Sequence, residues 1–165
     1  MQCSRKIKYN LVLSVFFLLL LIVGVGSYFS PVTFSNFQVI ENVWSGEIAT
    51  SFDGGNGTKE NPYLISTGEE LAYFKQVIES DNSYLYIDKY YALSTNINMG
   101  NLSFEPIKTT FKGHFDGQGY TIKNIKIDKI INKDNKLYIG IFTEIDNAAI
   151  ENINLDNIKL EIEEE

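Results

Sequence analysis

The stretch Thr121-Ile-Lys-Asn-Ile-Lys-Ile-Asp-Lys-Ile130 returns later in the chain as Ala149-Ile-Glu-Asn-Ile-Asn-Leu-Asp-Asn-Ile158. A shorter copy, Asn96-Ile-Asn-Met99, precedes Asn124-Ile-Lys-Ile127 by the same interval. A fixed period built on short β-rich segments is typical of solenoid proteins, because each repeat forms one coil that packs on the next. The repeat therefore predicts a mainly β protein with the fold of a short parallel β-helix.

Alternation within each copy predicts which side chains enter the core, because successive residues of a strand point to opposite faces. The expected inward side chains are Ile97, Met99, Ile125, Ile127, Ile153 and Leu155. The expected outward side chains lie between them and are Asn98, Lys126 and Asn154. Asn96, Asn124 and Asn152 share one phase of the repeat, which predicts a hydrogen-bonded ladder of amides at a coil corner. Three independent turn asparagines are the alternative.

A second set of strands is expected between the copies. The segment 111–115 (Phe-Lys-Gly-His-Phe) aligns with 138–142 (Tyr-Ile-Gly-Ile-Phe) at nearly the same interval, and a polar loop at 132–136 would lengthen the coil. Ile158, Leu160 and Ile162 alternate as a last strand, which is followed by the acidic tail 163–165. Charge at a strand edge blocks pairing with another chain. Three interpretations are open: the tail serves as a minimal cap, this end pairs with a partner, or the chain is a fragment of a longer protein.

A single helix is expected ahead of the repeats, near residues 68–80. Thr67-Gly-Glu-Glu70 fits a capping box, in which the Thr67 hydroxyl accepts from the third helical amide and Glu70 reaches back. The apolar side chains that follow recur at helical spacing and form one face, made of Leu71, Phe74, Val77 and Ile78. This face would cover the open first coil as an N-terminal capping helix.

The N-terminus combines positive charge with a long apolar run. Arg5, Lys6 and Lys8 precede an apolar run over 11–25, which is the arrangement of a secretory signal peptide. Continued to Phe29, the uncharged run covers 11–29. Because about 20 residues span a bilayer, an uncleaved transmembrane anchor is the alternative.

These signals divide the chain into three parts. We assign 1–29 to a signal peptide or N-terminal transmembrane anchor, 30–43 to a linker and 44–165 to the β-helix domain with its helix. Both interpretations of the N-terminus place the β domain outside the cytoplasm, because positive charge retains the N-terminal end inside. The protein is therefore expected to be extracytoplasmic, either anchored to the cell membrane or secreted.

The part of the chain after residue 29 is acidic and contains no cysteine. Cys3 lies before the apolar run, so neither disulfides nor thiol chemistry is expected outside the cytoplasm. Without Arg5, Lys6 and Lys8, 11 of the 14 basic residues remain against 21 acidic ones, a net charge of −10. No nucleic acid partner is expected, because binding to phosphates needs the opposite charge.

Several motifs come in the order found in bacterial cell-surface proteins that carry the GLUG motif. They are Trp44-Ser-Gly46, Phe52-Asp-Gly-Gly-Asn-Gly-Thr58, Asn61-Pro-Tyr63, Glu70-Leu71, Asn96-Ile97, Phe104-Glu-Pro-Ile107, Phe111-Lys-Gly-His-Phe-Asp-Gly-Gln-Gly119 and Ile122-Lys-Asn-Ile125. The chain resembles this family from Trp44 to Leu155, although Thr143 replaces the last glycine of the Gly-Leu-Phe-Gly motif. The resemblance implies a right-handed parallel β-helix, exported as part of an adhesin-like surface protein, and it supplies no catalytic residues.

Three groups of residues carry side chains that bind ligands in other proteins. His114 and Asp116 share a strand face and could cleave a polysaccharide, but an Asp-Gly pair is typical of a turn. The segment 53–56 could offer Asp53 and Asn56 oxygens to calcium, yet it lacks the alternating acidic spacing of a calcium loop. A tyrosine cluster could stack on sugar rings or pack where the helix meets the first coil, and we expect the packing role. Its members are Tyr84, Tyr86, Tyr90 and Tyr91. No catalytic, cofactor-binding or metal residue is assigned.

The sequence therefore predicts a non-catalytic module displayed at the cell surface, which binds a carbohydrate or protein ligand in an adhesive role. A structural element of the cell envelope that self-associates through its C-terminal coil is the alternative, and a polysaccharide-acting enzyme is a third. The membrane is a partner through residues 11–29 if this segment stays uncleaved. No cofactor is expected.

Overall fold

Short strands separated by tight corners make up most of the domain. The structure, a computed structural model, describes residues 41–128, 130–131, 137–138 and 140–161. Its strands are β1 (Tyr63–Ile65), β2 (Tyr90–Leu93), β3 (Ile97–Asn98), β4 (Ser103–Phe104), β5 (His114–Asp116), β6 (Thr121–Lys123), β7 (Lys126–Asp128), β8 (Ile130–Ile131), β9 (Leu137–Tyr138), β10 (Ala149–Glu151), β11 (Asn154–Asp156) and β12 (Lys159–Glu161). Its helices are the α-helix α2 (Gly68–Glu79) and the 3-10 helix η1 (Ser83–Leu85).

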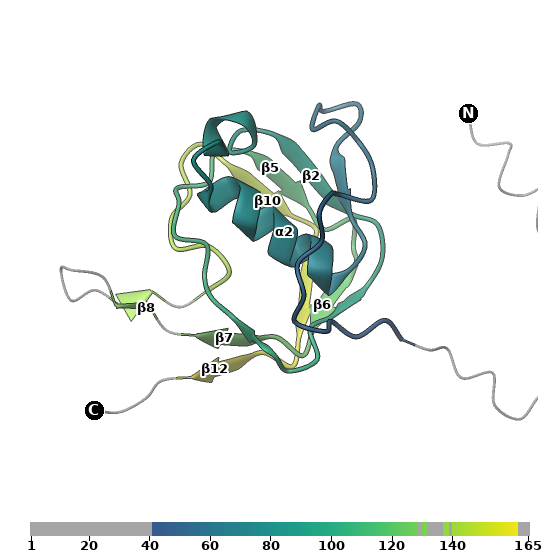
Figure 1. Cartoon of the computed structure of the whole chain (residues 1–165), viewed down its shortest axis with the longest axis vertical. Coiled ribbons are helices and arrows are strands. Elements are labelled where there is room, and N and C mark those ends of the chain that lie inside the picture. Colours follow the sequence, from purple (N-terminus) through teal and green to yellow (C-terminus); the bar gives the residue numbers. More distant parts are fainter. Residues whose placement is uncertain (1–40, 129, 132–136, 139, 162–165) are drawn as a thin grey trace, which may run out of the picture. The chain divides into compact units, whose positions relative to one another are not determined.

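Three sheets contain parallel strands, in the orders β1-β2-β5-β10, β3-β6-β11 and β4-β7-β12. The chain visits these sheets in the same order three times, first through β2, β3 and β4, then through β5, β6 and β7, and finally through β10, β11 and β12. Figure 1 shows β2, β5 and β10 side by side, and β7 next to β12. We call each circuit a pass. The predicted mainly β class with one helix is confirmed.

The strand register contradicts the constant interval of the sequence repeat. That interval would pair Ile97 with Ile125, but Ile97 pairs with Ile122, which is a shorter step along the chain. The next step is longer, since Ile122 pairs with Leu155. The last pass is longer because the antiparallel pair β8–β9 lies between β7 and β10. The loop predicted at 132–136 lies outside the described residues.

The alignment of 111–115 with 138–142 is also wrong. Phe115 pairs instead with Ile150 of β10. The segment 140–146 runs beside the connection between β4 and β5, through isolated parallel bridges from Ile107 to Phe142 and from Phe111 to Ile145. β10 follows β5 at a longer interval than the sequence repeat, because β8 and β9 lie between β7 and β10. Aligning segments at the repeat interval therefore does not find the strand that pairs with β5.

The helix begins where the sequence predicts, with a cap that differs in one detail. The Thr67 hydroxyl accepts a hydrogen bond from the Glu70 amide at 3.2 Å. The Glu70 carboxylate reaches back one residue further than a capping box requires, because it accepts from the amide and the hydroxyl of Ser66 at 2.6 and 2.9 Å. Both contacts satisfy polar groups at the start of the helix, which lacks internal acceptors for its first amides.

The apolar face of α2 packs into the core as predicted. Leu71, Phe74, Val77 and Ile78 are all buried. The Phe74 ring lies at the centre of this packing, with ring centroids of Tyr91, Phe115 and Phe111 at 4.6, 5.4 and 5.8 Å. In Figure 1 the helix lies in front of β2, β5 and β10. The helix therefore covers inward side chains of two successive passes.

Most of the predicted inward residues are buried, but two predictions need correction. Ile97, Met99, Ile125 and Ile127 are buried and Ile153 is partly buried, whereas Leu155 is half exposed because it lies on the last pass. Asn98 was expected to point outward and is buried instead. Its side-chain oxygen accepts from the Gly100 amide at 3.0 Å and from the Asn124 side chain at 2.9 Å, and these contacts offset the cost of burying an amide.

The domain contains an asparagine ladder, although its members differ from those predicted. The Asn124 side chain donates to Asn98, and the Asn157 side chain donates to Asn124 at 2.6 Å. Asn124 and Asn157 occupy equivalent corners and have positive φ angles of 55° and 49°, a conformation that asparagine tolerates better than most residues. The predicted partners are elsewhere: Asn96 accepts from the Thr121 amide, and Asn152 donates to Asp116.

The described region begins within the predicted linker and ends within the predicted last strand. Val43, at the end of the predicted linker, forms a parallel bridge with Asn98. The predicted last strand corresponds to β12, whereas Ile162 and the acidic tail 163–165 lie outside the described residues. Among the described residues, no helix has the length and apolar composition needed to cross a bilayer. The apolar run at 11–29 lies outside them.

Candidate functional site

A groove lies on the outer face of the sheet β1-β2-β5-β10. In β5, His114 and Asp116 alternate with the inward Phe115, so both side chains point outward as their spacing predicts. The register places Tyr90 beside His114 and Glu151 beside Asp116. The groove holds about 420 Å³ and is lined by Lys59, Pro62, Tyr90, Tyr91, Ala92, His114, Asp116, Gln118 and Glu151. We call it the His114 groove.

Two contacts orient the imidazole of His114. Its Nε2 lies 2.9 Å from Oε1 of Glu151. The Tyr90 ring stacks on it with a centroid separation of 5.3 Å and an interplanar angle of 27°. Glu151 contacts one edge of the imidazole ring and Tyr90 contacts its face. Together they fix the orientation of the His114 side chain on the outer surface of the sheet.

Asp116 has a structural role and remains part of the groove. Its Oδ1 accepts from the Gln118 amide at 2.9 Å and from the Asn152 side chain at 3.0 Å, and the Gln118 side chain donates to Oδ2. The first contact is the turn hydrogen bond expected of an Asp-Gly pair. Partial burial would raise the pKa of Asp116, but the Gln118 amide, the side chains of Asn152 and Gln118, and His114 together lower it below its usual value. Asp116 is therefore ionised at neutral pH.

The groove brings together three side chains that carry ligand atoms for metals. His114, Asp116 and Glu151 each offer one such atom, and these atoms lie within 4.8 Å of one another. The sequence indicated His114 and Asp116 through their alternation on one strand. Glu151 could not be found in this way, because its position depends on the pairing of β5 with β10. The alternation of Ala149-Ile-Glu151 was its only signal.

A second groove lies between α2 and the segment around β4. It holds about 520 Å³ and is lined by Trp44, Gly46, Ile48, Ala72, Lys75, Gln76, Glu79, Ser80, Ser103, Phe104 and Glu105. It is larger than the His114 groove and more apolar, so volume alone does not identify the better site.

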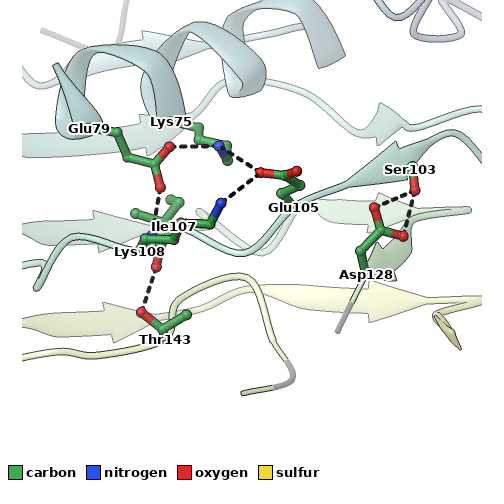
Figure 2. Close-up of polar contacts among 8 residues, drawn as sticks. All are labelled: Lys75, Glu79, Ser103, Glu105, Ile107, Lys108, Asp128 and Thr143. Atoms are coloured by element: carbon green, nitrogen blue, oxygen red, sulfur yellow. Dashed lines mark hydrogen bonds and ion pairs between the residues drawn. The ribbon is translucent and has the colours of Figure 1, made fainter. Parts of the chain in front are cut away.

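The charges beside the second groove are paired with one another, as Figure 2 shows. Lys75 lies 2.6 Å from Glu79 and 3.9 Å from Glu105, and Lys108 lies 3.1 Å from Glu105. The second oxygen of Glu79 accepts from the Lys108 backbone amide at 2.6 Å. Two lysines therefore balance two glutamates, and the network ties α2 to the segment that follows β4. We regard the His114 groove as the better candidate, because its charged groups are not engaged in a balanced network of this kind.

The segment 53–56, weighed as a calcium loop, forms a turn. The Asn56 side-chain oxygen accepts from the amide and the hydroxyl of Thr58 at 3.2 and 2.9 Å. Gly55 has a φ angle of 84°, and a Cβ atom there would lie 1.8 Å from the carbonyl oxygen of Pro62. The glycine is required by this close approach of two backbone segments.

The four tyrosines do not form one cluster. Tyr91 is buried and its hydroxyl donates to the Tyr86 carbonyl at 2.7 Å, in agreement with the packing role. Tyr84 is 68% exposed, and it lies outside the His114 groove. Tyr90 alone presents its ring to the outer face beside His114. The correction follows from the strand, since neighbours such as Tyr90 and Tyr91 point to opposite faces.

Comparison with known proteins gives two relatives. Over 116 residues, 68% of its length, the chain is 32% identical to a protein of Evansella cellulosilytica named as a Gly-rich membrane protein. Over 123 residues, also 68% of its length, it is 34% identical to halomucin of Haloquadratum walsbyi. The matched stretches cover 13% and 1% of these two proteins. No family model matches the chain. No solved structure matches it.

Proposed function

We propose that this chain is a non-catalytic module displayed outside the cytoplasm, and that it binds carbohydrate in the His114 groove. The observation that carries the proposal is the combination of an aromatic ring with polar groups in one groove. Tyr90 offers a sugar ring the part of its aromatic surface that is not stacked on His114. Asp116, Gln118, Glu151 and Lys59 offer donors and acceptors for hydroxyl groups. Aromatic rings with nearby polar groups suit ligands that are apolar on one face and polar at the edges.

The architecture we propose for this module is a parallel β-helix, in which the three parallel sheets are the faces of a coil. The repeated visiting order of the sheets and the continuous core support this arrangement. Its right-handed form and the relation to GLUG-motif proteins remain predictions from the sequence.

The arrangement of the carboxylates favours binding over glycoside cleavage. A general acid needs a raised pKa so that it holds a proton near neutral pH. Asp116 has the opposite property, because three donors surround its carboxylate and its pKa is lowered. Glu151 is about half exposed to solvent, and its Oε1 lies 2.9 Å from His114 Nε2. We therefore assign neither residue a catalytic role.

The location is inferred from two independent indications. The basic and apolar segments at the N-terminus are typical of export, and one relative carries the name of a membrane protein. We propose that the β domain lies outside the cytoplasm, either secreted or held at the membrane by residues 11–29.

Saturation-transfer NMR and calorimetry with neutral, amino and acidic oligosaccharides would test carbohydrate binding. Tyr90→Ala should weaken binding about 3- to 10-fold, because ring stacking contributes roughly 0.5–1.5 kcal/mol beyond area burial. Tyr84→Ala is the matched control, since it removes an exposed tyrosine outside the groove. Equal losses in the two variants, or binding by neither the parent nor the variants, would reject the groove as a glycan site.

Self-association is a second candidate function, which the last pass favours. Within the described residues, β10, β11 and β12 each end a sheet, and Leu155 and Leu160 are half exposed there. Light scattering on the full chain, in a detergent that disperses the N-terminal segment, would test it. A dimer or larger species that becomes monomeric in Leu155→Lys and Leu160→Lys would support this candidate, and a monomeric parent would reject it.

A further inference from the structure

We propose that His114, Asp116 and Glu151 together bind a divalent transition metal ion of the Zn²⁺ type. The inference rests on the proposed function only in using the same groove, and it deepens that function by adding a metal to the site. Neither the sequence motifs nor the relatives' names indicate such a site.

The distances between the three side chains suit one small ion. Zn²⁺ lies about 2.0–2.1 Å from imidazole nitrogen and about 2.0–2.2 Å from carboxylate oxygen. Two ligand atoms of one ion are therefore separated by roughly 3–4 Å. His114 Nε2 and Glu151 Oε1 lie 2.9 Å apart, and all three ligand atoms lie within 4.8 Å. The Glu151 side chain is half exposed, so it can close the remaining distance by a small rotation.

The charges in the sheet also favour a bound cation. Asp116 and Glu151 are directly paired across β5 and β10, and both are acidic. Like charges at directly opposed positions destabilise a sheet. A divalent ion between them would offset that repulsion. Lys59 also lines the groove, so its charge would oppose the ion and limit the affinity.

The surrounding contacts hold two of the ligands in place. Tyr90 stacks on the His114 ring, while Gln118 and Asn152 hydrogen-bond to Asp116. Such outer contacts orient metal ligands and strengthen binding. One imidazole and two carboxylates suit Zn²⁺ and related ions better than Ca²⁺, which takes oxygen ligands. Three protein ligands leave a coordination position open, which a sugar hydroxyl or water can fill.

The chain is well suited to a direct test, because His114 is its single histidine and Cys3 its single cysteine. Untagged full chain would be titrated with Zn²⁺ by calorimetry, while the imidazole nitrogens are followed by NMR. We expect one ion per chain with a Kd of roughly micromolar order, and a shift of the His114 signals at the same Zn²⁺ concentration. Lys59→Ala should tighten binding.

Conservative variants separate metal ligation from structure. Asp116→Asn keeps an oxygen that can accept from the Gln118 amide, and Glu151→Gln keeps one for His114. Each, like His114→Ala, should weaken Zn²⁺ binding at least about tenfold. Asp156→Asn removes an exposed carboxylate from β11 and should leave the affinity unchanged. Circular dichroism would confirm that every variant is folded.

Two results would overturn the inference. One is the absence of Zn²⁺ binding to the folded parent. The other is binding that leaves the imidazole signals unmoved and persists in His114→Ala, which would indicate scattered surface carboxylates. Glycan titrations with and without EDTA keep the two proposals apart. Glycan binding by a folded chain that binds no Zn²⁺ would remove the metal inference alone, and Zn²⁺ binding without any glycan binding would remove the proposed function alone.

Discussion

The middle pass and the last pass carry similar side chains in the same register and bury them very differently. Ile122 is fully buried, whereas Leu155, its partner in the next strand, is 49% exposed. Ile127 is 3% exposed and its partner Leu160 is 51% exposed. Ile122 and Ile127 lie on the middle strands of their sheets, whereas Leu155 and Leu160 lie on edge strands. The same sequence pattern therefore yields a core residue or a surface residue according to the position of its strand in the sheet.

The helix α2 shows how inward apolar side chains can be covered. Its apolar face packs into the same core as the inward side chains of the strands, through Leu71, Phe74, Val77 and Ile78. Within the described residues, the last pass has no comparable cover. An apolar side chain on an edge strand is therefore kept from water only where another element covers it.

The largest expected effect comes from breaking the covered end. Phe74→Ala should lower the free energy of unfolding by about 3–5 kcal/mol, because a fully buried ring that contacts Tyr91, Phe111 and Phe115 leaves a cavity. Urea unfolding followed by circular dichroism measures this loss. Tyr84→Ala is the control and should change stability little, since Tyr84 is exposed. A loss below about 1 kcal/mol in Phe74→Ala would mean that the helix does not cover the core in solution.

The second effect compares two apolar residues that are paired in neighbouring strands of one sheet, Ile122 and Leu155. Ile122→Ala should cost about 2–5 kcal/mol, while Leu155→Ala should cost about 1 kcal/mol, because half of its surface is already in water. Paired thermal and urea unfolding of the two variants gives the difference. Equal costs would contradict the exposed end and would indicate that another chain covers Leu155 in solution.

The asparagine ladder gives a third and smaller difference. Asn124→Ala should cost about 2 kcal/mol, because it removes hydrogen bonds to both Asn98 and Asn157 and leaves an alanine at a positive φ angle. Asn124→Gly should recover part of this cost by removing the strain. Asn157→Ala on the last pass should cost less, since it loses one ladder contact. Equal unfolding free energies for all three variants would argue against the ladder.

The smallest effect is a pH dependence at Asp116. Its pKa is lowered from the usual 3.8 in the folded protein, so its contribution to stability is present above pH 3.8 and is lost as the pH falls through the lower, folded pKa. The melting temperature of the parent should therefore fall further than that of Asp116→Asn as the pH is lowered below about 4. Parallel curves for the two proteins would show that the contacts of Asp116 do not favour its ionised form.

The sequence predicts the strand class, the helix and most core residues, but it cannot predict the strand register. The reason is visible in the last pass, where Ile150, Leu155 and Leu160 recur at one short, constant spacing and the corner residues Asn152 and Asn157 do the same. Each face of the stack repeats the same short unit. The sequence around Asn124 therefore resembles the sequence around Asn152 as closely as that around Asn157. The repeat in the sequence aligns Asn124 with Asn152, but in the structure Asn124 is hydrogen-bonded to Asn157.

The candidate site was predictable only as far as it lies on one strand. His114 and Asp116 flank a single residue, and alternation suffices to place them on one face. Glu151 joins them through the pairing of β5 with β10, which depends on the length of the intervening residues. The burial of Asn98 was missed for a similar reason, because its side-chain partner Asn124 belongs to the next pass.

The unequal lengths of the passes have a practical consequence. The step along the chain from Phe104 to Ile127 is shorter than the step from Ile127 to Leu160, yet all three share one sheet in regular register. The β8–β9 pair lies in the longer connection, and the strands on either side of it still pair in regular register. For protein engineering, the connection between β7 and β10 is therefore where an added peptide is expected to disturb the strand pairs least.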